Sequence, residues 1–247
     1  MKFLEFFKKL LYPNTKCIVC NEELFTNDAF SICPKCLNSL HFLDDKICCI
    51  CGVKLYGEGK LCERCKNNEY REIKLARSVF EYDDIMKNLI HSLKYDNKKY
   101  LAKPLSNILY NYFTYHNEIN DVDIIIPVPL HKSRYKKRGY NQTELLLQSF
   151  KETHQVRTDI VERIKDTPTQ TKLSLEERRK NLENAFSLVK PEDIKNKRIL
   201  IVDDIFTTGA TTLTLAKLLV KNKARSVKCL TLCHTSKKLD FEKEYDN

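Results

Sequence analysis

The chain has 247 residues, of which 42% are hydrophobic and 31% are charged. This composition can bury a core and excludes an intrinsically disordered protein. Lys and Arg outnumber Asp and Glu by 43 to 33, and residues 1–70 hold only 10 basic and nine acidic side chains, so the excess lies in the rest of the chain. A basic surface favours anionic partners such as phosphates or nucleic acid, although the same excess also fits a solvated face.

The amino-terminal segment Phe3–Tyr12 is apolar but is interrupted by Glu5, Lys8 and Lys9. It is too short to span a bilayer, which takes about 20 apolar residues, and no small-residue cleavage site follows it. We expect a short amphipathic helix that docks on the body of the protein, with a membrane-surface role as the alternative. The 11 cysteines then indicate a reducing cytoplasm, where clustered cysteines usually bind metal, and not a secreted disulfide scaffold.

Eight cysteines form four Cys-x-x-Cys pairs. The pairs are Cys17/Cys20, Cys33/Cys36, Cys48/Cys51 and Cys62/Cys65. Two such pairs make a closed tetrahedral zinc site, so we expect two structural zinc ions, grouped sequentially or, as the alternative, crossed. Redox dithiols are disfavoured because a redox pair normally occurs once. Residues 1–70 are predicted to form a double zinc-ribbon module whose folding depends on the metal, and residues 71–247 a second domain.

Strand-like and helix-like segments alternate in the second part of the chain. Strands are expected at Ser78–Tyr82, Val122–Val128, Arg198–Val202 and Val227–Cys233, and helices at Asp83–Lys94, Tyr100–Tyr115, Asn141–Thr153, Glu176–Asn184 and Gly209–Lys221. This alternation favours an α/β fold with a mostly parallel sheet flanked by helices. In open sheets of this kind, ligands bind beyond the carboxyl ends of the strands.

The segment Ile199–Thr212 has the pattern of an anion site. A buried strand leads into Asp203 and Asp204, and a loop rich in Thr and Gly then opens a helix. Backbone N–H groups at a helix start bind phosphate, and Gly209 lets the backbone approach the ligand closely. The alternative is an ordinary strand-turn-helix with a Thr cap. The loop matches neither the nucleotide-binding P-loop nor the dinucleotide-binding motif.

A second polar segment follows the predicted strand Val122–Val128. Five of the seven residues Lys132–Arg138 are basic, and they precede a predicted helix. We expect a loop that binds an anion such as pyrophosphate, with a solvated basic loop as the alternative.

The Asp-Asp loop resembles the phosphoribosyl pyrophosphate (PRPP) motif of type I phosphoribosyltransferases. In that family the two acids bind the ribose hydroxyls and the loop holds the 5′-phosphate. The resemblance implies that Asp203 and Asp204 contact the ribose. It also implies a phosphate site made by Thr207, Thr208, Gly209, Ala210 and Thr211.

The resemblance narrows to the ComF family. It is carried by Pro127–Leu130, Arg138–Gln142, Ile90–Tyr95 and a spaced series that begins at Arg163, and together with the cysteines it covers nearly the whole chain. It implies a phosphoribosyltransferase fold and a role in DNA uptake during natural transformation. The segment Lys165–Leu175 corresponds to a mobile lid. Departures are small, such as Tyr140 where Phe is frequent.

Two functions are consistent with these features. The first is a phosphoribosyltransferase that binds PRPP with Mg²⁺, in which Arg134, Lys137 and Arg138 stabilise the departing pyrophosphate. The second is a single-stranded-DNA-binding competence factor that uses PRPP as a ligand or signal without turnover. Its expected DNA contacts are Lys94, Tyr95, Arg134, Lys136 and Lys137. Other DNA-uptake proteins are possible partners. A scaffold acting through the ribbon alone is disfavoured because it leaves the PRPP loop unexplained.

Overall fold

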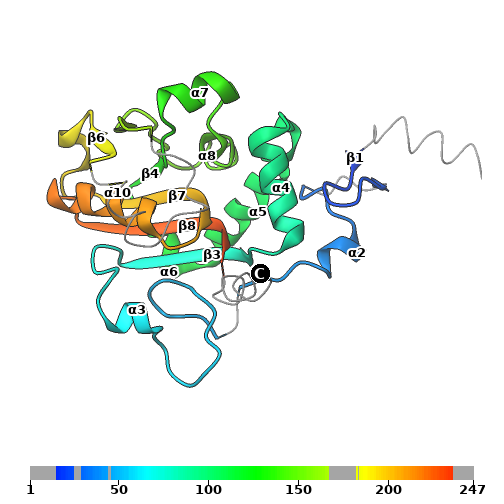
Figure 1. Cartoon of the computed structure of the whole chain (residues 1–247), viewed down its shortest axis with the longest axis horizontal. Helices are drawn as coiled ribbons and strands as arrows, with labels where there is room; N and C mark the ends of the chain where they lie inside the picture. Colours follow the sequence, from blue (N-terminus) through cyan, green and yellow to red (C-terminus); the bar gives the residue numbers. More distant parts are fainter. Residues whose placement is uncertain (1–14, 25–28, 44–45, 167–181, 183, 236–247) are drawn as a thin grey trace, which may run out of the picture.

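A computed structural model describes residues 15–24, 29–43, 46–166, 182 and 184–235 (Figure 1). The predicted amphipathic segment, and most of the predicted lid and of the helix Glu176–Asn184, lie outside these ranges. Within them, no helix combines the length and the apolar character needed to cross a membrane.

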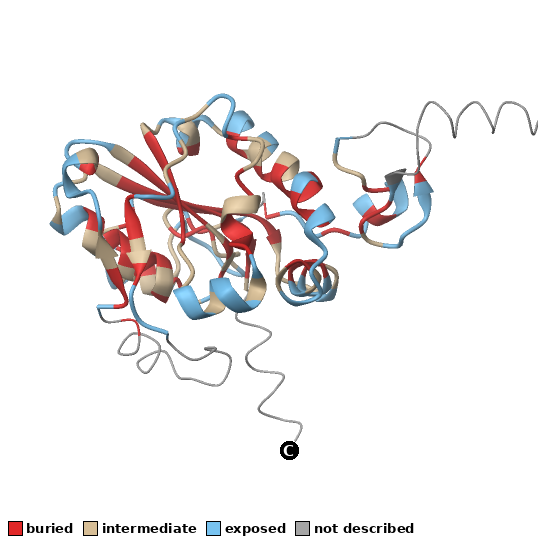
Figure 2. Cartoon of the chain, turned by 90° about the horizontal axis from the view of Figure 1, so that it is seen from above, coloured by how far each residue is buried: buried red, intermediate tan, exposed pale blue. Residues whose placement is uncertain are grey.

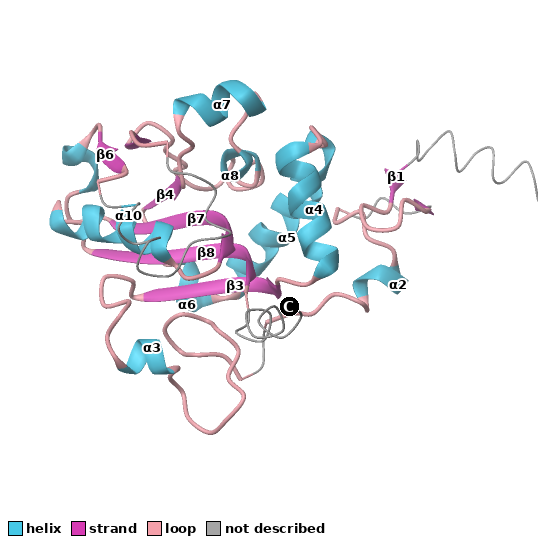
Figure 3. Cartoon of the chain, in the orientation of Figure 1, coloured by secondary structure: helices cyan, strands magenta, loops and turns pink. Residues whose placement is uncertain are grey.

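The strands are β1 (Thr15–Lys16), β2 (Glu23–Leu24), β3 (Leu75–Glu81), β4 (Ile124–Pro127), β5 (Val161–Arg163), β6 (Phe186–Leu188), β7 (Arg198–Phe206) and β8 (Ser226–His234). The helices are α2 (Pro34–Leu37), α3 (Glu63–Lys66), α4 (Asp84–Tyr95), η1 (Lys99–Leu101), α5 (Ala102–Tyr115), α6 (Asn117–Asn120), α7 (Lys132–Arg138), α8 (Gln142–Leu145), η3 (Pro191–Ile194) and α10 (Ala210–Lys221). Figure 3 shows how they alternate around the central strands.

Four parallel strands form the sheet, in the order β3-β8-β7-β4. The four predicted strands are therefore confirmed. Strand β7 is longer than predicted because Asp203 pairs with Thr231 and Ile205 with Cys233 on β8. The two acids thus belong to the last part of a strand, and backbone pairing fixes their positions.

Strand β7 is buried on both faces, as parallel strands usually are. Leu200 and Val202 belong to one apolar cluster, together with residues of α4 and α5. Ile199 and Ile201 belong to a second cluster, which includes residues of α10. Helices therefore cover both faces of the sheet, and the strands form the buried centre of the molecule (Figure 2).

The predicted helix Asn141–Thr153 is mostly wrong. Helix α8 ends at Leu145, and the chain continues in tight turns in which Phe150 donates to the carbonyl of Leu147 and Thr153 to that of Phe150. These i→i+3 bonds replace α-helical ones. They turn Leu147 and Phe150 into the core, where both are fully buried.

The two halves of the cysteine module pack on different faces of the sheet. Cys17, Cys33 and Cys36 belong to the cluster that contains α4 and α5. Cys48, Cys51 and Cys65 belong to the cluster that contains α10. Between them, residues 41–43 run along the outer edge of β3, where Leu43 donates to Val79 and Glu81 donates to His41. This connection covers an edge strand that would otherwise expose unpaired backbone groups.

Candidate functional site

The paired acids lie at the carboxyl end of β7 and face a lysine of α4. The Lys94 ammonium forms an ion pair with Asp204, and their side chains are 18% and 6% exposed. Gln142, the first residue of α8, donates from Nε2 to Asp204 Oδ1 at 3.3 Å. Asp203 Oδ1 accepts from the backbone N–H of Asp204 at 2.9 Å. Three separate elements therefore hold the carboxylates at the end of the sheet where ligands are expected.

Burial and charge shift the pKa values of the two acids in opposite directions. Burial raises the pKa of Asp203 well above its usual value, and the neighbouring Asp204 raises it further. Burial also raises the pKa of Asp204, but the Lys94 ammonium and the hydrogen bonds from Asp203 and Gln142 together outweigh it, so the pKa of Asp204 is lowered. Asp204 is therefore the carboxylate that stays charged, with Lys94 as its counterion.

The loop after β7, residues 207–211, is called the phosphate loop below. Gly209 has φ +66°, in the left-handed region that favours glycine, and α10 begins at Ala210. Thr208 Oγ1 accepts from the Ala210 N–H at 3.3 Å. Thr212 is buried and donates its hydroxyl to the carbonyl of Gly209, so it stabilises the helix start and is not available to a ligand. The loop leads into the amino-terminal end of a 12-residue helix, the kind of position at which backbone N–H groups can bind an anion.

The basic segment after β4 is a helix, α7, and the prediction of a loop was wrong. His131 Nδ1 accepts from the Ser133 N–H at its start, and Gly139 ends it with φ +79°. Arg134, Lys137 and Arg138 lie on one side because residues three and four apart are neighbours on a helix. Arg134 pairs with Asp166 at 3.2 Å.

Helix α7 is connected to the paired acids. The Arg138 guanidinium donates to Gln142 Oε1, and Gln142 in turn donates to Asp204. The same guanidinium lies 5.2 Å from the ring centre of Tyr95, the last residue of α4. The structure thus links Arg138, one of the predicted pyrophosphate residues, through Gln142 to Asp204, one of the predicted ribose residues. Lys137 is exposed on the same helix.

Lys94 and Arg163 lie in surroundings that the sequence did not predict. Lys94, a predicted DNA contact, is directed at Asp204, so its ammonium is not part of an open surface. Arg163 is the last residue of β5, and its place in the family pattern predicts no role for it. It is 8% exposed, and burial and the nearby Arg134 lower its pKa, whereas Asp203 raises it. Arg163 therefore lies near the acids, and the sequence offered only its basic character as a signal.

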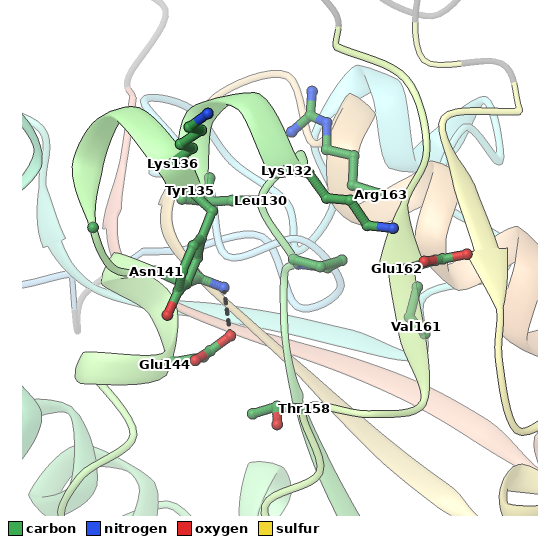
Figure 4. A pocket seen from close by; sticks show the side chains of 12 residues that line it. Leu130, Lys132, Tyr135, Lys136, Asn141, Glu144, Thr158, Val161, Glu162 and Arg163 are labelled. Carbon is green, nitrogen blue, oxygen red and sulfur yellow. Dashed lines mark hydrogen bonds between the residues drawn. The ribbon is translucent and has the colours of Figure 1, made fainter.

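A cavity of about 590 Å³ lies between α7 and β5 (Figure 4). Its wall combines apolar side chains, such as Leu130 and Tyr135, with the polar ends of Glu144 and Glu162. Arg163 borders it as well. Neither the paired acids nor the phosphate loop lines this cavity, so the cavity is separate from them.

The eight paired cysteines form two groups, and the grouping is sequential. The first comprises Cys17, Cys20, Cys33 and Cys36, and the second Cys48, Cys51, Cys62 and Cys65, with the ligand atoms of each group within 4.8 Å of one another. Four thiols so close together fit a tetrahedral zinc ion with no open position, which is a structural site. Burial raises the pKa of Cys65 to about 12, so metal binding must displace protons. Cys49 is exposed and outside both groups, and Cys229 and Cys233 are core residues of β8.

Known families match both parts of this architecture. A double zinc ribbon domain matches residues 7–66, and a phosphoribosyl transferase domain matches residues 136–247. A parallel α/β domain with paired acids before a phosphate loop, joined to two Cys₄ groups, therefore defines a phosphoribosyltransferase-type protein with a double zinc ribbon.

The curated relatives identify the family. The DNA utilization protein YhgH of Escherichia coli is 33% identical over 224 residues, covering 89% of this chain and 96% of that protein. Competence protein F of Haemophilus influenzae is 33% identical over 216 residues, covering 84% and 92%. Competence protein ComFC of Streptococcus pneumoniae is 27% identical over 229 residues, covering 88% and 99%. The chain belongs to this ComF family of competence and DNA utilization proteins.

Solved structures add little to this assignment. A hypoxanthine phosphoribosyltransferase from Staphylococcus aureus is 18% identical, covers 54% of this chain and 64% of that chain, and has a TM-score of 0.34. The assignment rests on the family matches and the curated relatives.

Proposed function

We propose that this protein binds PRPP at the carboxyl end of β7. The proposal rests on the pair Asp203 and Asp204, which lies directly before a loop that opens α10. Lys94 and Gln142 hold Asp204, and the Asp204 N–H donates to Asp203. Vicinal hydroxyls of a ribose can donate to such a carboxylate pair. Helix α10 begins six residues after Asp204, and its first N–H groups can donate to the 5′-phosphate.

The binding residues divide by the part of the ligand they contact. Asp203 and Asp204 accept from the ribose hydroxyls. The 5′-phosphate binds to Thr207, Thr208, Gly209, Ala210 and Thr211. The pyrophosphate group binds the cationic side of α7 through Arg134, Lys137 and Arg138, and arrives with Mg²⁺ as its counterion.

This arrangement suits transfer of the phosphoribosyl group. When an acceptor attacks C1′, negative charge collects on the departing pyrophosphate, and fixed guanidinium groups stabilise that charge. Arg134 and Arg138 supply such groups, since the first is held by Asp166 and the second by Gln142. The chemistry requires positioned charges and no covalent nucleophile from the protein.

A second candidate function is single-stranded DNA binding. It is supported by aromatic side chains that lie among the basic residues of α7 and α4. Tyr95 is 59% exposed and Tyr135 is 49% exposed. Bases can stack on such rings while Lys136, Lys137 and Arg134 bind the backbone phosphates. The names of the relatives, competence and DNA utilization proteins, favour a role with DNA and with other uptake proteins, and the cysteine-rich zinc sites favour the reducing cytoplasm as its location.

The ligand proposal is tested by thermal unfolding with and without PRPP and Mg²⁺. Binding to the native state raises the melting temperature, and 100 Kd of free ligand stabilises by about 2.7 kcal/mol. The double substitution Asp203→Asn with Asp204→Asn should remove this shift while the zinc content stays unchanged. A double variant that still responds to PRPP would show that the ribose is bound elsewhere.

A further inference from the structure

The carbonyl of Thr208, inside the phosphate loop, accepts hydrogen bonds from two side chains that lie 144 and 138 positions earlier in the chain. Arg64 donates from Nη2 at 3.0 Å, and the Tyr70 hydroxyl donates at 2.9 Å. Both donors belong to the segment that carries the second group of cysteines, called the second ribbon below (residues 48–70). A direct connection therefore joins a zinc site to the proposed phosphate site.

The zinc ligands fix the position of these donors. Arg64 lies in α3 between the ligands Cys62 and Cys65, so the metal knuckle determines where its side chain starts. Its guanidinium pairs with Glu69 at 3.1 Å and lies 4.7 Å from the ring centre of Tyr70. Tyr70 is 3% exposed. Both side chains are therefore preorganised by contacts within the second ribbon.

Holding the Thr208 carbonyl determines where the next N–H points. The carbonyl of Thr208 and the N–H of Gly209 belong to one planar trans peptide, so they point in opposite directions. A carbonyl bound to the second ribbon therefore directs the Gly209 N–H away from that ribbon. Rotation of this peptide would break two hydrogen bonds at once.

The packing around Gly209 maintains the same orientation. A Cβ at this position would lie 2.5 Å from Phe206 Cζ and 2.9 Å from Tyr70 Cε1. The centre of the Phe206 ring lies 5.8 Å from the ring centre of Tyr70 and 5.0 Å from that of His234. The loop backbone at Gly209 is thus packed against the side chains of Phe206 and Tyr70.

We infer that the second ribbon is a positioning element for the phosphate loop, in which Arg64 and Tyr70 orient the Thr208–Gly209 peptide for the 5′-phosphate. The inference rests on the proposed binding of PRPP and deepens it. It assigns the zinc ion bound by Cys48, Cys51, Cys62 and Cys65 an influence on phosphate affinity. The first group of cysteines packs instead with α4 and α5 on the other face of the sheet.

The test uses Tyr70→Phe and Arg64→Met, singly and together, in the full zinc-loaded chain. Tyr115→Phe and Arg71→Met are matched controls, because Tyr115 is 78% exposed and Arg71 is 77% exposed at its side chain. Calorimetry measures affinity for two probes, ribose 5-phosphate and inorganic pyrophosphate. Ribose 5-phosphate requires the phosphate loop, whereas pyrophosphate binds the cations of α7.

Loss of one hydrogen bond to the Thr208 carbonyl should lower the affinity for ribose 5-phosphate about fivefold, and the double variant should lower it about 30-fold. Pyrophosphate affinity and zinc content should match those of the controls. Equal losses for both probes would indicate general destabilisation and overturn the inference, as would unchanged affinity for ribose 5-phosphate.

A second measurement needs no ligand. The chain has only five glycines, so selective ¹⁵N-glycine labelling resolves the Gly209 amide in a sparse spectrum. Tyr70→Phe should shift the Gly209 resonance in the ligand-free protein, and Tyr115→Phe should not. An unshifted resonance overturns the positioning role. If the wild-type protein binds neither PRPP nor ribose 5-phosphate, the proposed function fails, and the Gly209 shift still decides the positioning claim separately.

Discussion

At the scale of single residues, the buried ammonium of Lys94 determines the charge of the paired acids. It contacts Asp204, and its charge helps to lower the pKa of that carboxyl, whereas burial and the neighbouring Asp204 keep the pKa of Asp203 raised. A carboxylate pair without such a cation would be costly in a site that is only partly open to water. Lys94 therefore keeps Asp204 ionised and ready to accept ribose hydroxyls.

Replacing Lys94 by Met should destabilise the protein by roughly 3–5 kcal/mol, because it leaves a buried charge without its partner. It should also reverse the sign of the pH dependence that Asp204 contributes, whereas Asp203, whose pKa is already raised in the wild type, keeps its sign. In the wild type the lowered pKa of Asp204 gives stability above the unfolded-state pKa, and that stability is lost as the pH falls through the folded-state pKa. In the variant burial should raise the pKa of Asp204, so its contribution to stability falls as the pH rises from the unfolded-state pKa through the raised folded-state pKa.

Thermal unfolding across this pH range measures the effect. Lys87→Met is the matched control, because Lys87 is an exposed lysine of the same helix. A Lys94→Met profile parallel to that of the control would show that the ammonium does not govern the acids.

At the scale of elements, α3 and its zinc knuckle connect the metal to the ligand site. Cys62→Ser should reduce the zinc content from about two ions per chain to about one, since three thiolates no longer close the site. Because α3 then loses its anchor, ribose 5-phosphate affinity should fall about tenfold or more, as two hydrogen bonds to the loop are lost.

Cys49→Ser is the control for this change, since Cys49 is an exposed thiol next to a ligand but outside the group. It should keep both zinc ions and full affinity. Elemental analysis and calorimetry report the two quantities separately. A Cys62→Ser protein that loses zinc yet binds the probe normally would contradict the connection.

Helix α7 is the element on which the two candidate functions differ. Replacing Arg134, Lys137 and Arg138 by Ala should make the dependence of single-stranded DNA binding on salt less steep. The slope of log K against log salt concentration should fall in magnitude by about two, at roughly 0.7 per lost phosphate contact. Saturating PRPP should displace DNA from the wild-type protein. Fluorescence anisotropy over a series of salt concentrations checks both effects. If neither the triple substitution nor PRPP changes the affinity for DNA, the nucleic acid binds elsewhere, such as on the ribbons.

The elements differ in how far the sequence alone could predict them. Apolar runs located all four strands of the sheet, and cysteine spacing located both Cys₄ groups. Helix α7 was missed because an exposed helix needs no apolar stripe, and its signals were only the His131 cap and the terminal Gly139. The pairing of Lys94 with Asp204 was missed because it joins residues 110 positions apart, and helical periodicity says nothing about such contacts.

At the scale of the whole molecule, the zinc ribbons and the α/β domain act as one structure. Family matching separates residues 7–66 from residues 136–247, and we propose a boundary near residue 70. The two ribbons nevertheless pack on opposite faces of the sheet, and buried Arg77 of β3 bonds both the Cys49 carbonyl and Glu118. We therefore expect the ribbons and the sheet to unfold together.

The central claim, that the acids of β7, the phosphate loop and α7 form one PRPP site, is tested most directly by a crystal structure of the protein with PRPP and Mg²⁺. We expect the ribose hydroxyls on Asp203 and Asp204, the 5′-phosphate at the start of α10 and the pyrophosphate against Arg134 and Arg138. Density for PRPP in the cavity between α7 and β5, with the acids still bound only to Lys94 and Gln142, would contradict it.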